Sequence, residues 1–371
     1  MGEAHSSRAA IAIVAPVPPP VGGMALQAQA LRDRVREEGF PAEVVSTNPS
    51  IPAALDRIPG LRAITKTLIY LASLGRVVPR VAVVHVLAAS YFYFFARVLP
   101  AVLLCRVSGR RVIVNYRGGE AFVFFRRYGW LARPVLSLAN VLTVPSSYLK
   151  RCFEEQGFAP EIIGNFVNPD RFHFRERTQL TPKLIVARSL EPMYNVEMAV
   201  RAFALIKQTC SQATLDVLGT GTEENRLKRI VRDLRLDGVE FYGEVPHQSV
   251  PVLLDRCDIL LNPTNVDNFP MNLIEAFASG LAVVSTNVGG VVDLLAGSDA
   301  AALVQPDDYR AMAEKVLFLL NHPAHVQSQM LAGRSLAEKY SWESIRENLF
   351  NLYFPDPKHV PIGRTFSPGA K

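Results

Sequence analysis

The segment with the greatest chemical potential runs from Asp267 to Gly290 and reads DNFPMNLIEAFASGLAVVSTNVGG. Asn268 is a residue type that caps helices, Pro270 suits a first helical turn, and Gly280 can end a helix. The free backbone amides of such a helix, around Phe269 to Asn272, would bind an anion such as a diphosphate. An ordinary capped helix explains the same spacing.

Two acids flank the predicted helix start. Asp267 comes just before it and Glu275 lies one turn further on, with seven residues between them. Carboxylates at these places could accept hydrogen bonds from sugar hydroxyls, and a solvated acid on a helix is the simpler alternative.

Two glycine pairs follow predicted strands, Gly22-Gly23 and Gly219 with Gly221. Glycine lets the backbone approach a phosphate closely. Neither pair completes the GxGxxG fingerprint, so a dinucleotide site is not indicated. A tight turn explains both pairs almost as well.

Short apolar runs separated by helical segments would position these residues. The pattern predicts an α/β protein with two doubly wound parallel sheets. Strands are expected in the first half at 10–15, around Val44, and at 81–86, 111–115, 141–144 and 161–163, and in the second half at 183–187, 215–218, 239–242, 259–261 and 282–285.

A length of 371 residues fits two domains. We predict domains at 1–165 and 183–340, a polar linker at 166–182, a helix at 341–354 and a proline-rich mobile tail at 355–371. The four cysteines lack CxxC spacing, which predicts neither a zinc site nor a disulfide framework and fits a reducing cytoplasm. The N-terminus does not resemble a signal peptide.

Charge is uneven: residues 1–165 carry a net +9 and residues 166–371 a net −3. Eight arginines between Arg97 and Arg133 have one acid, Glu120, among them, and they alternate with aromatic residues from Tyr91 to Trp130. This pattern suits an anionic membrane surface, and a core helix with a solvated basic face explains it equally. Residues 88–105 could span a bilayer in length, but Arg97 at their centre argues against it.

The 267–290 segment resembles the signature of family 4 glycosyltransferases of the GT-B fold. That signature is written Glu-x7-Glu, followed by a small-residue helix, a strand and a Gly-Gly loop. Here the two acids are Asp267 and Glu275, and the loop is Gly289-Gly290. Further similar segments are Gly22-Gly23, Pro145–Phe158, Gly164–Phe172, Leu215–Gly221, Phe241–Pro246 and Ser341–Phe354.

The resemblance implies two Rossmann-like domains facing a cleft. It also implies retaining transfer of a sugar from a nucleotide-diphosphate sugar to a glycan or lipid-linked acceptor, with no metal and no other cofactor. Residues 1–165 would bind the acceptor and 183–340 the donor, and helix 341–354 would return to the first domain. We expect a cytoplasmic protein at the inner face of the cytoplasmic membrane, with no nucleic-acid partner.

Site roles carry over by position. Glu275 would hold the ribose, Asp267 the donor sugar, and Arg188 the charge that develops on the diphosphate. The remaining predicted donor-site residues are Gly22, Gly23, Tyr194, Gly219, Val245, Asn268, Phe269, Pro270, Met271, Asn272 and Leu273.

Three positions depart from the family pattern. The first acid is Asp267 rather than Glu, Tyr194 stands where a second cation is usual, and Arg117 stands where a histidine is usual. One hypothesis is that Arg117 restores the missing cation; alternatively it caps a strand or binds the acceptor. Rival interpretations of the chain are a GT-B epimerase or phosphorylase, and a degenerate transferase that serves as a binding or scaffold protein.

Overall fold

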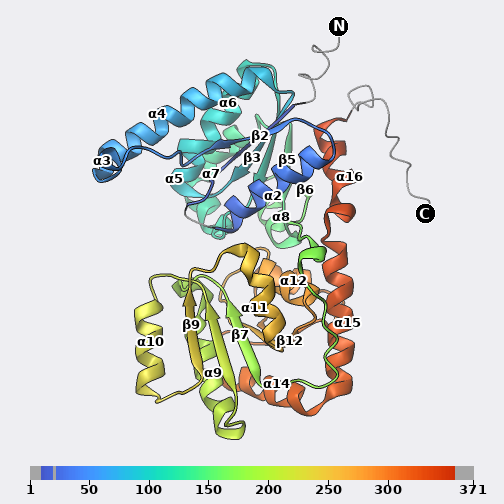
Figure 1. The fold of residues 1–371 in the computed structure, drawn as a ribbon. Helices are drawn as coiled ribbons and strands as arrows, with labels where there is room; N and C mark the ends of the chain where they lie inside the picture. Colours follow the sequence, from blue (N-terminus) through green and yellow to red (C-terminus); the bar gives the residue numbers. More distant parts are fainter. Residues whose placement is uncertain (1–9, 20–21, 356–371) are drawn as a thin grey trace, which may run out of the picture. The chain divides into compact units, whose positions relative to one another are not determined.

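The chain folds into two compact units. Unit 1 comprises Met1–Asn165 and Ile345–Lys371, and unit 2 comprises Phe166–Ser344. The computed structural model describes residues 10–19 and 22–355, with the elements labelled in Figure 1. The tail predicted at 355–371 therefore lies outside the described residues, apart from Pro355.

Unit 1 contains a six-stranded sheet in the order β2-β1-β3-β4-β5-β6, and every pair of neighbours in it is parallel. Its central strands β1 and β3 are buried along their whole length, as expected where helices cover both faces of a parallel sheet. The strands are β1 (Ile11–Ala15), β2 (Ala42–Ser46), β3 (Val83–Ala88), β4 (Arg111–Tyr116), β5 (Val141–Val144) and β6 (Glu161–Ile162).

Helices cover both faces of this sheet. On one face, Val84 and Val86 of β3 join a hydrophobic cluster with Tyr70 and Phe124 from the helices. His85 alternates with those valines and points to the other face, where it meets Tyr353. The helices are α2 (Gly23–Glu37), α3 (Ala53–Asp56), α4 (Pro59–Val77), α5 (Tyr91–Tyr93), α6 (Leu99–Val107), α7 (Ala121–Leu136), α8 (Ser147–Glu154) and the part of α16 (Trp342–Tyr353) from Ile345 onward, with short helical turns η2 (Val78–Arg80) and η3 (Phe94–Val98).

The arginine-rich aromatic stretch forms core in large part. Phe94 and Phe124 are fully buried, and the segment 91–107 is divided among α5, the π-helical turn η3 and α6. Arg97 is itself buried, with its guanidinium over the ring of Tyr70. Among the described residues no helix is both long enough and apolar enough to cross a membrane.

Unit 2 repeats the architecture with a parallel sheet in the order β12-β11-β10-β7-β8-β9. Its strands are β7 (Lys183–Ala187), β8 (Thr214–Leu218), β9 (Val239–Gly243), β10 (Ile259–Asn262), β11 (Ala282–Thr286) and β12 (Ala302–Val304). Its helical elements are η4 (Pro169–Arg171), η5 (Pro192–Tyr194), α9 (Val196–Thr209), α10 (Glu224–Asp233), η6 (His247–Ser249), α11 (Val250–Arg256), α12 (Met271–Ala278), α13 (Gly289–Leu294), α14 (Tyr309–Asn321) and α15 (Pro323–Lys339).

The predicted fold class is confirmed, since both units are doubly wound parallel α/β sheets. The strand order of unit 2 reverses between β7 and β10, because the chain builds outward from β7 to β9 and then returns to place β10 on its other side. In open α/β sheets, ligands bind beyond the carboxyl ends of the strands at such a reversal. Arg188 directly follows β7, and the loop with Asp267 follows β10.

Buried His85 predicts a pH dependence for unit 1. Burial, aided by nearby Arg117, lowers the pKa of His85 to about 3, so the folded state keeps the ring neutral. In the unfolded chain its pKa is about 6.5, so below that pH the unfolded state binds a proton that the folded state refuses. We expect His85 to reduce the stability of unit 1 by about 1.4 kcal/mol per pH unit as pH falls below 6.5 toward 3.

Hydrogen exchange of the β3 amides, followed from pH 7 to pH 5, measures this dependence. The His85→Phe variant should flatten it, whereas His325→Phe, at an exposed site in unit 2, should not. An unchanged pH dependence in His85→Phe would contradict the assignment.

Candidate functional site

Arg188 and Asp267 meet at the strand reversal of unit 2. The Arg188 guanidinium donates from Nη2 to Asp267 Oδ2 at 2.5 Å and from Nη1 to Asn272 Oδ1 at 3.0 Å. It also lies over the ring of Tyr194, 4.1 Å from the ring centroid. Asp267, Asn272 and Tyr194, all predicted as site residues, therefore surround Arg188.

The cluster is mostly enclosed. The side chains of Arg188 and Asp267 are 11% and 10% exposed, so their charges interact more strongly than a surface pair would. Asp267 and Asn272 accept two of the five guanidinium N–H groups, and Arg188 Nε is buried with no partner among the described residues. The cluster therefore holds the Arg188 cation in place and leaves some of its N–H groups able to donate to a ligand.

Tyr194 contributes a ring face here where the family pattern has a cation. A guanidinium stacked on an aromatic ring is stabilised by a cation–π interaction and is restricted in its rotation. Tyr194 therefore brings no positive charge to this position, but its ring restricts the orientation of the Arg188 guanidinium.

Glycines let two loops press against the site. A Cβ at Gly290 would overlap the carbonyl oxygen of Asn268, and one at Gly289 would overlap that of Asp267. The Gly290 amide donates to Asp267 O at 2.7 Å. Gly219 lies equally close to the carbonyl of Arg188, at φ +127°. The glycine pair of the motif and Gly219 therefore fix the backbone that carries the charged pair.

The start of α12 differs from the predicted cap. Asn268 was expected to cap the helix, but α12 begins at Met271 with Pro270 at the cap position, so that prediction is wrong. The Asp267 carboxylate instead accepts the Phe269 amide at 3.0 Å, because the loop turns before the helix starts. Gly280 ends the helix as predicted, with φ +71°.

Glu275 is buried in α12, with 8% of its surface exposed. Its Oε1 lies 2.9 Å from His247 Nε2, and Arg171 Nη1 lies 3.3 Å from His247 Nδ1. Because arginine only donates hydrogen bonds, Nδ1 is the acceptor and the ring proton lies on Nε2, facing Glu275. Leu273 of the same helix and Val245, which precedes His247, belong to the hydrophobic cluster around α12.

Sequence reasoning missed His247 and Arg171. They lie 28 and 104 residues from Glu275 along the chain, and no spacing pattern connects them. Only the fold brings the three together.

The other predicted residues lie in unit 1. Gly22 and Gly23 form the start of α2, with open space where a Cβ would stand. Arg117 follows β4, its Nε donates to Asn115 Oδ1 at 3.1 Å, and burial lowers its pKa to about 10. The guanidinium therefore stays charged at neutral pH.

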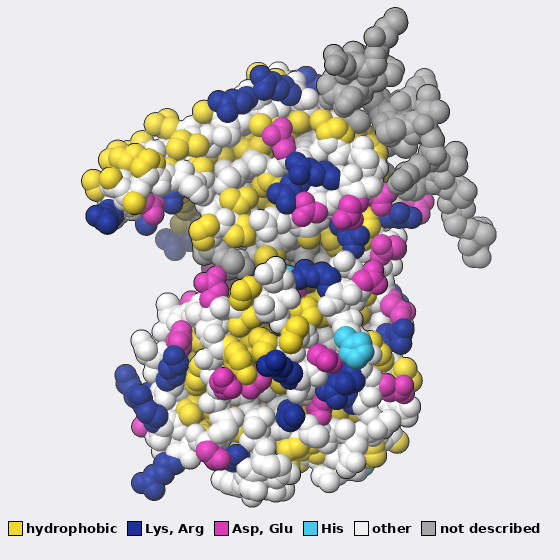
Figure 2. Space-filling model, viewed as in Figure 1, with side chains coloured by type: hydrophobic (Ala, Val, Ile, Leu, Met, Phe, Trp, Pro, Cys, Tyr) yellow, Lys and Arg dark blue, Asp and Glu magenta, His cyan; other side chains and the backbone are white. Residues whose placement is uncertain are grey.

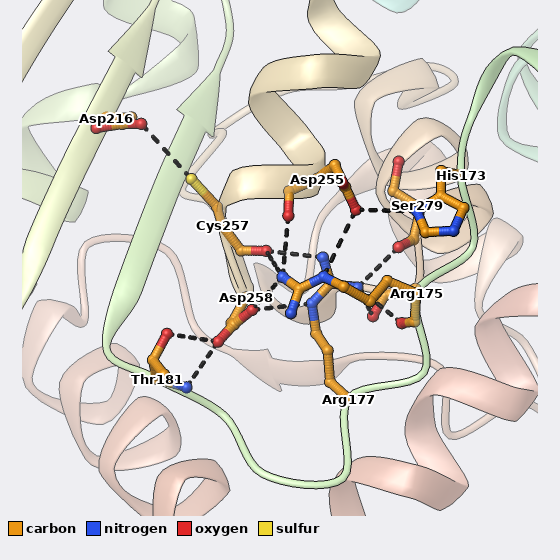
Figure 3. Close-up of polar contacts among 10 residues, drawn as sticks. His173, Arg175, Arg177, Thr181, Asp216, Asp255, Cys257, Asp258 and Ser279 are labelled. Atoms are coloured by element: carbon orange, nitrogen blue, oxygen red, sulfur yellow. Dashed lines mark hydrogen bonds and ion pairs between the residues drawn. The ribbon is translucent and has the colours of Figure 1, made fainter.

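Residues 166–182, interpreted as a linker from their polarity, belong to unit 2 and are held there by a buried ionic network. Figure 3 shows Arg175 and Arg177 reaching from this segment toward Asp258, and Thr181 contacting the same carboxylate. Burial raises the pKa of Asp258, but hydrogen bonds from Thr181 and both arginines outweigh burial and hold it below the usual range.

Arg177 links this network to the helix of the site. Its fully buried side chain donates from Nη1 to the carbonyl oxygens of Ser279 and Gly280, at 2.8 and 2.7 Å. These carbonyls lie at the carboxyl end of α12, where a cation is favoured by the helix dipole. The network therefore fixes the helix that carries Glu275. Within the described residues, no group of three or more His, Cys, Asp or Glu side chains is placed to hold a metal ion.

Two units, each built on a doubly wound parallel sheet, define the GT-B class of fold. Several solved structures share this fold. HepE of Anabaena, in complex with UDP and glucose, aligns with a TM-score of 0.70 at 15% identity, over 93% of this chain and 98% of that one. Sucrose-phosphate synthase of Thermosynechococcus elongatus aligns with a TM-score of 0.73 at 17% identity, with the same coverage of both chains. At these identities the likeness concerns the fold.

Residues 170–334, which lie in unit 2, match the family described as "Glycosyl transferases group 1". Relatives include glycogen synthase of Mycobacterium tuberculosis, 25% identical over 68% of this chain and 65% of that protein. The amylovoran biosynthesis glycosyltransferase AmsK of Erwinia amylovora is 30% identical over 46% of this chain and 44% of its own length. The matched stretches thus span less than two thirds of these relatives. These matches confirm the expected resemblance to a glycosyltransferase family.

The network in Figure 3 predicts a large loss of stability on removal of Arg177. Arg177→Met leaves Asp258 and two helix-end carbonyls buried without this donor, which should destabilise unit 2 by about 3–5 kcal/mol. Arg175→Met, whose side chain is 39% exposed, should cost about 1 kcal/mol.

Urea unfolding followed by fluorescence of buried Trp342, in a Trp130→Phe background, reports on unit 2. Equal losses of stability in the two arginine variants would show that Arg177 has no special structural role.

Proposed function

We propose that this protein is a retaining glycosyltransferase that moves a sugar from a nucleotide-diphosphate sugar to a glycan or lipid-linked acceptor. This sugar transfer would need no metal. It would take place at the inner face of the cytoplasmic membrane and serve cell-envelope or exopolysaccharide synthesis. The supporting observation is the enclosed Arg188–Asp267 cluster, which lies beside Glu275's helix at the strand reversal of unit 2. Two of the similar proteins point the same way: HepE is seen with UDP and glucose, and AmsK is named for amylovoran biosynthesis.

Arg188 carries the proposed chemistry. When the bond between the sugar and the diphosphate breaks, negative charge grows on the phosphate oxygens. A guanidinium fixed by Asp267, Asn272 and Tyr194 would stabilise that charge with no rearrangement of its own. Its remaining N–H groups would donate to the phosphate.

Retention would follow from attack on the same face. The acceptor oxygen bonds to the anomeric carbon as the bond from that carbon to the phosphate oxygen breaks. The acceptor hydroxyl proton passes to the departing diphosphate, so no covalent enzyme intermediate is needed. Asp267 would then orient the sugar rather than attack it.

Arg117 remains a proposed second cation. Its charge at neutral pH and its place after a strand of unit 1 suit the role that Tyr194 cannot fill. The Gly22-Gly23 turn would accompany it as a phosphate contact, because none of the described residues beyond the chain neighbours comes within 4 Å of a Cβ built at either glycine.

Arg188→Met should lower kcat at least about 100-fold, since it removes the cation that stabilises the leaving group. A thermal-shift screen of UDP-, GDP- and ADP-sugars first identifies the donor. Product analysis with membrane lipid extracts then measures transfer. Arg229→Met, at an exposed arginine of the same unit, is the matched control and should retain activity.

Three outcomes would contradict the proposal. Undiminished turnover in Arg188→Met would remove the role of that arginine. Conversion of the nucleotide sugar without acceptor would indicate an epimerase. Donor binding with no turnover under any acceptor would indicate a binding protein.

Glu275→Gln should weaken donor binding about 10-fold, because a buried charged acceptor for the ribose is lost. His247→Asn should have a smaller effect in the same direction, since His247 only positions the carboxylate. Both changes should raise KM more than they lower kcat. His325→Asn, an exposed histidine of unit 2, is the control, and a KM unchanged by Glu275→Gln would refute the ribose assignment.

A further inference from the structure

Helix α4 of unit 1 presents an apolar stripe to solvent. Ile64 and Leu68 are 59% and 61% exposed, which is far more than isolated leucines and isoleucines in a core helix would be. The spacing of three and four residues places the stripe on one side of the helix. Its members are Ile58, which precedes the helix, and Leu61, Ile64, Leu68 and Leu71.

The opposite side of α4 is firmly attached to unit 1. Tyr70 and Leu74 are buried in the hydrophobic cluster of the sheet. The Tyr70 hydroxyl donates to Arg97 O at 2.5 Å, and Arg97 Nη1 donates to Thr67 Oγ1 at 3.0 Å. The helix therefore has its core contact already, and the stripe is a second apolar face that no described residue covers.

Charge around the stripe is mainly basic, and the neighbouring acid Asp56 of α3 is paired with Lys66 of α4 at 2.9 Å. The sequence between Arg57 and Gly119 contains ten Lys and Arg residues and no Asp or Glu. Arg57, Arg62 and Arg76 lie on or next to α4 and are exposed. Figure 2 shows hydrophobic side chains gathered over α3 and α4 with basic side chains nearby.

This combination decides between partners. A second copy packed face to face on the stripe would bring the same basic residues together, because a twofold interface repeats one surface on both sides. A layer of anionic headgroups above apolar chains complements both the stripe and its arginines.

We propose that α4 lies in the interface of an anionic phospholipid bilayer, with its stripe among the acyl chains and its arginines at the headgroups. The inference rests on the proposed function and deepens it, since a lipid-linked acceptor is reached at such a surface. It also moves the membrane contact away from the aromatic segment 91–107, where four of the five aromatic side chains are buried or half-buried and Phe92 is exposed.

Sedimentation with vesicles tests the proposal. Wild-type protein should bind vesicles of equal phosphatidylglycerol and phosphatidylcholine, should bind pure phosphatidylcholine far less, and should be partly released by salt. Ile64→Gln/Leu68→Gln should lower the ratio of bound to free protein at least about 10-fold. Glutamine preserves helix propensity, and circular dichroism verifies folding.

A matched variant removes exposed apolar side chains elsewhere. Val252→Gln/Leu331→Gln alters residues of unit 2 that are 56% and 54% exposed, and its binding should stay within about twofold of wild type. Arg57→Gln/Arg62→Gln/Arg76→Gln should weaken binding and reduce its sensitivity to salt.

Three results would overturn the inference: equal binding to neutral and anionic vesicles, unchanged binding of the stripe variant, or a wild-type dimer that the stripe variant converts to monomer in ultracentrifugation. Thermal shift with the nucleotide sugar, measured on the same preparations without vesicles, tests the proposed function separately. If a variant loses vesicle binding but keeps the thermal shift with the nucleotide sugar, the result bears on the role of α4 and leaves the proposed donor binding intact.

Discussion

The contact between Arg188 and Asp267 is the constraint on which the rest of unit 2 depends. The first need is an anion beside the enclosed cation Arg188, because an unpaired buried charge is costly. The second need is space for the backbone that carries Asp267, so the loops packed against it must lack side chains. Gly219 and the Gly289-Gly290 pair meet the second need, since a Cβ at any of them would overlap the carbonyl of a site residue. The strand order meets the first, because it brings the ends of β7 and β10 together.

Rigidity of the site originates partly outside it. Arg177 binds the carboxyl end of α12, and Arg171 reaches His247, which in turn contacts Glu275. Both arginines come from the segment 166–182, whose polar sequence suggested a simple connection. Its polarity instead reflects side chains that satisfy buried acceptors, since carbonyls at a helix end need donors when water is excluded.

Much of the fold could be predicted from the sequence, because buried parallel strands are continuous apolar runs. Strands β5 and β7 match the predicted ranges, whereas β12 was missed since it has three residues and a weak pattern. The motif residues were found by resemblance, yet their mutual contacts were not. His247 illustrates why: its partner Glu275 is distant in the chain, and hydrogen-bond geometry depends on tertiary packing rather than on local propensity.

Unit 1 combines a core of aromatic residues with an amphipathic helix whose outer stripe is covered by none of the described residues. In the proposed function, unit 1 would contact a lipid surface and unit 2 would bind the activated sugar. The central claim concerns where the donor's diphosphate lies. A crystal structure of the protein with the nucleoside diphosphate found by the donor screen tests it most directly. The diphosphate should lie within hydrogen-bond distance of Arg188, with the ribose hydroxyls on Glu275. A nucleotide bound elsewhere, with the Arg188 cluster untouched, would contradict it.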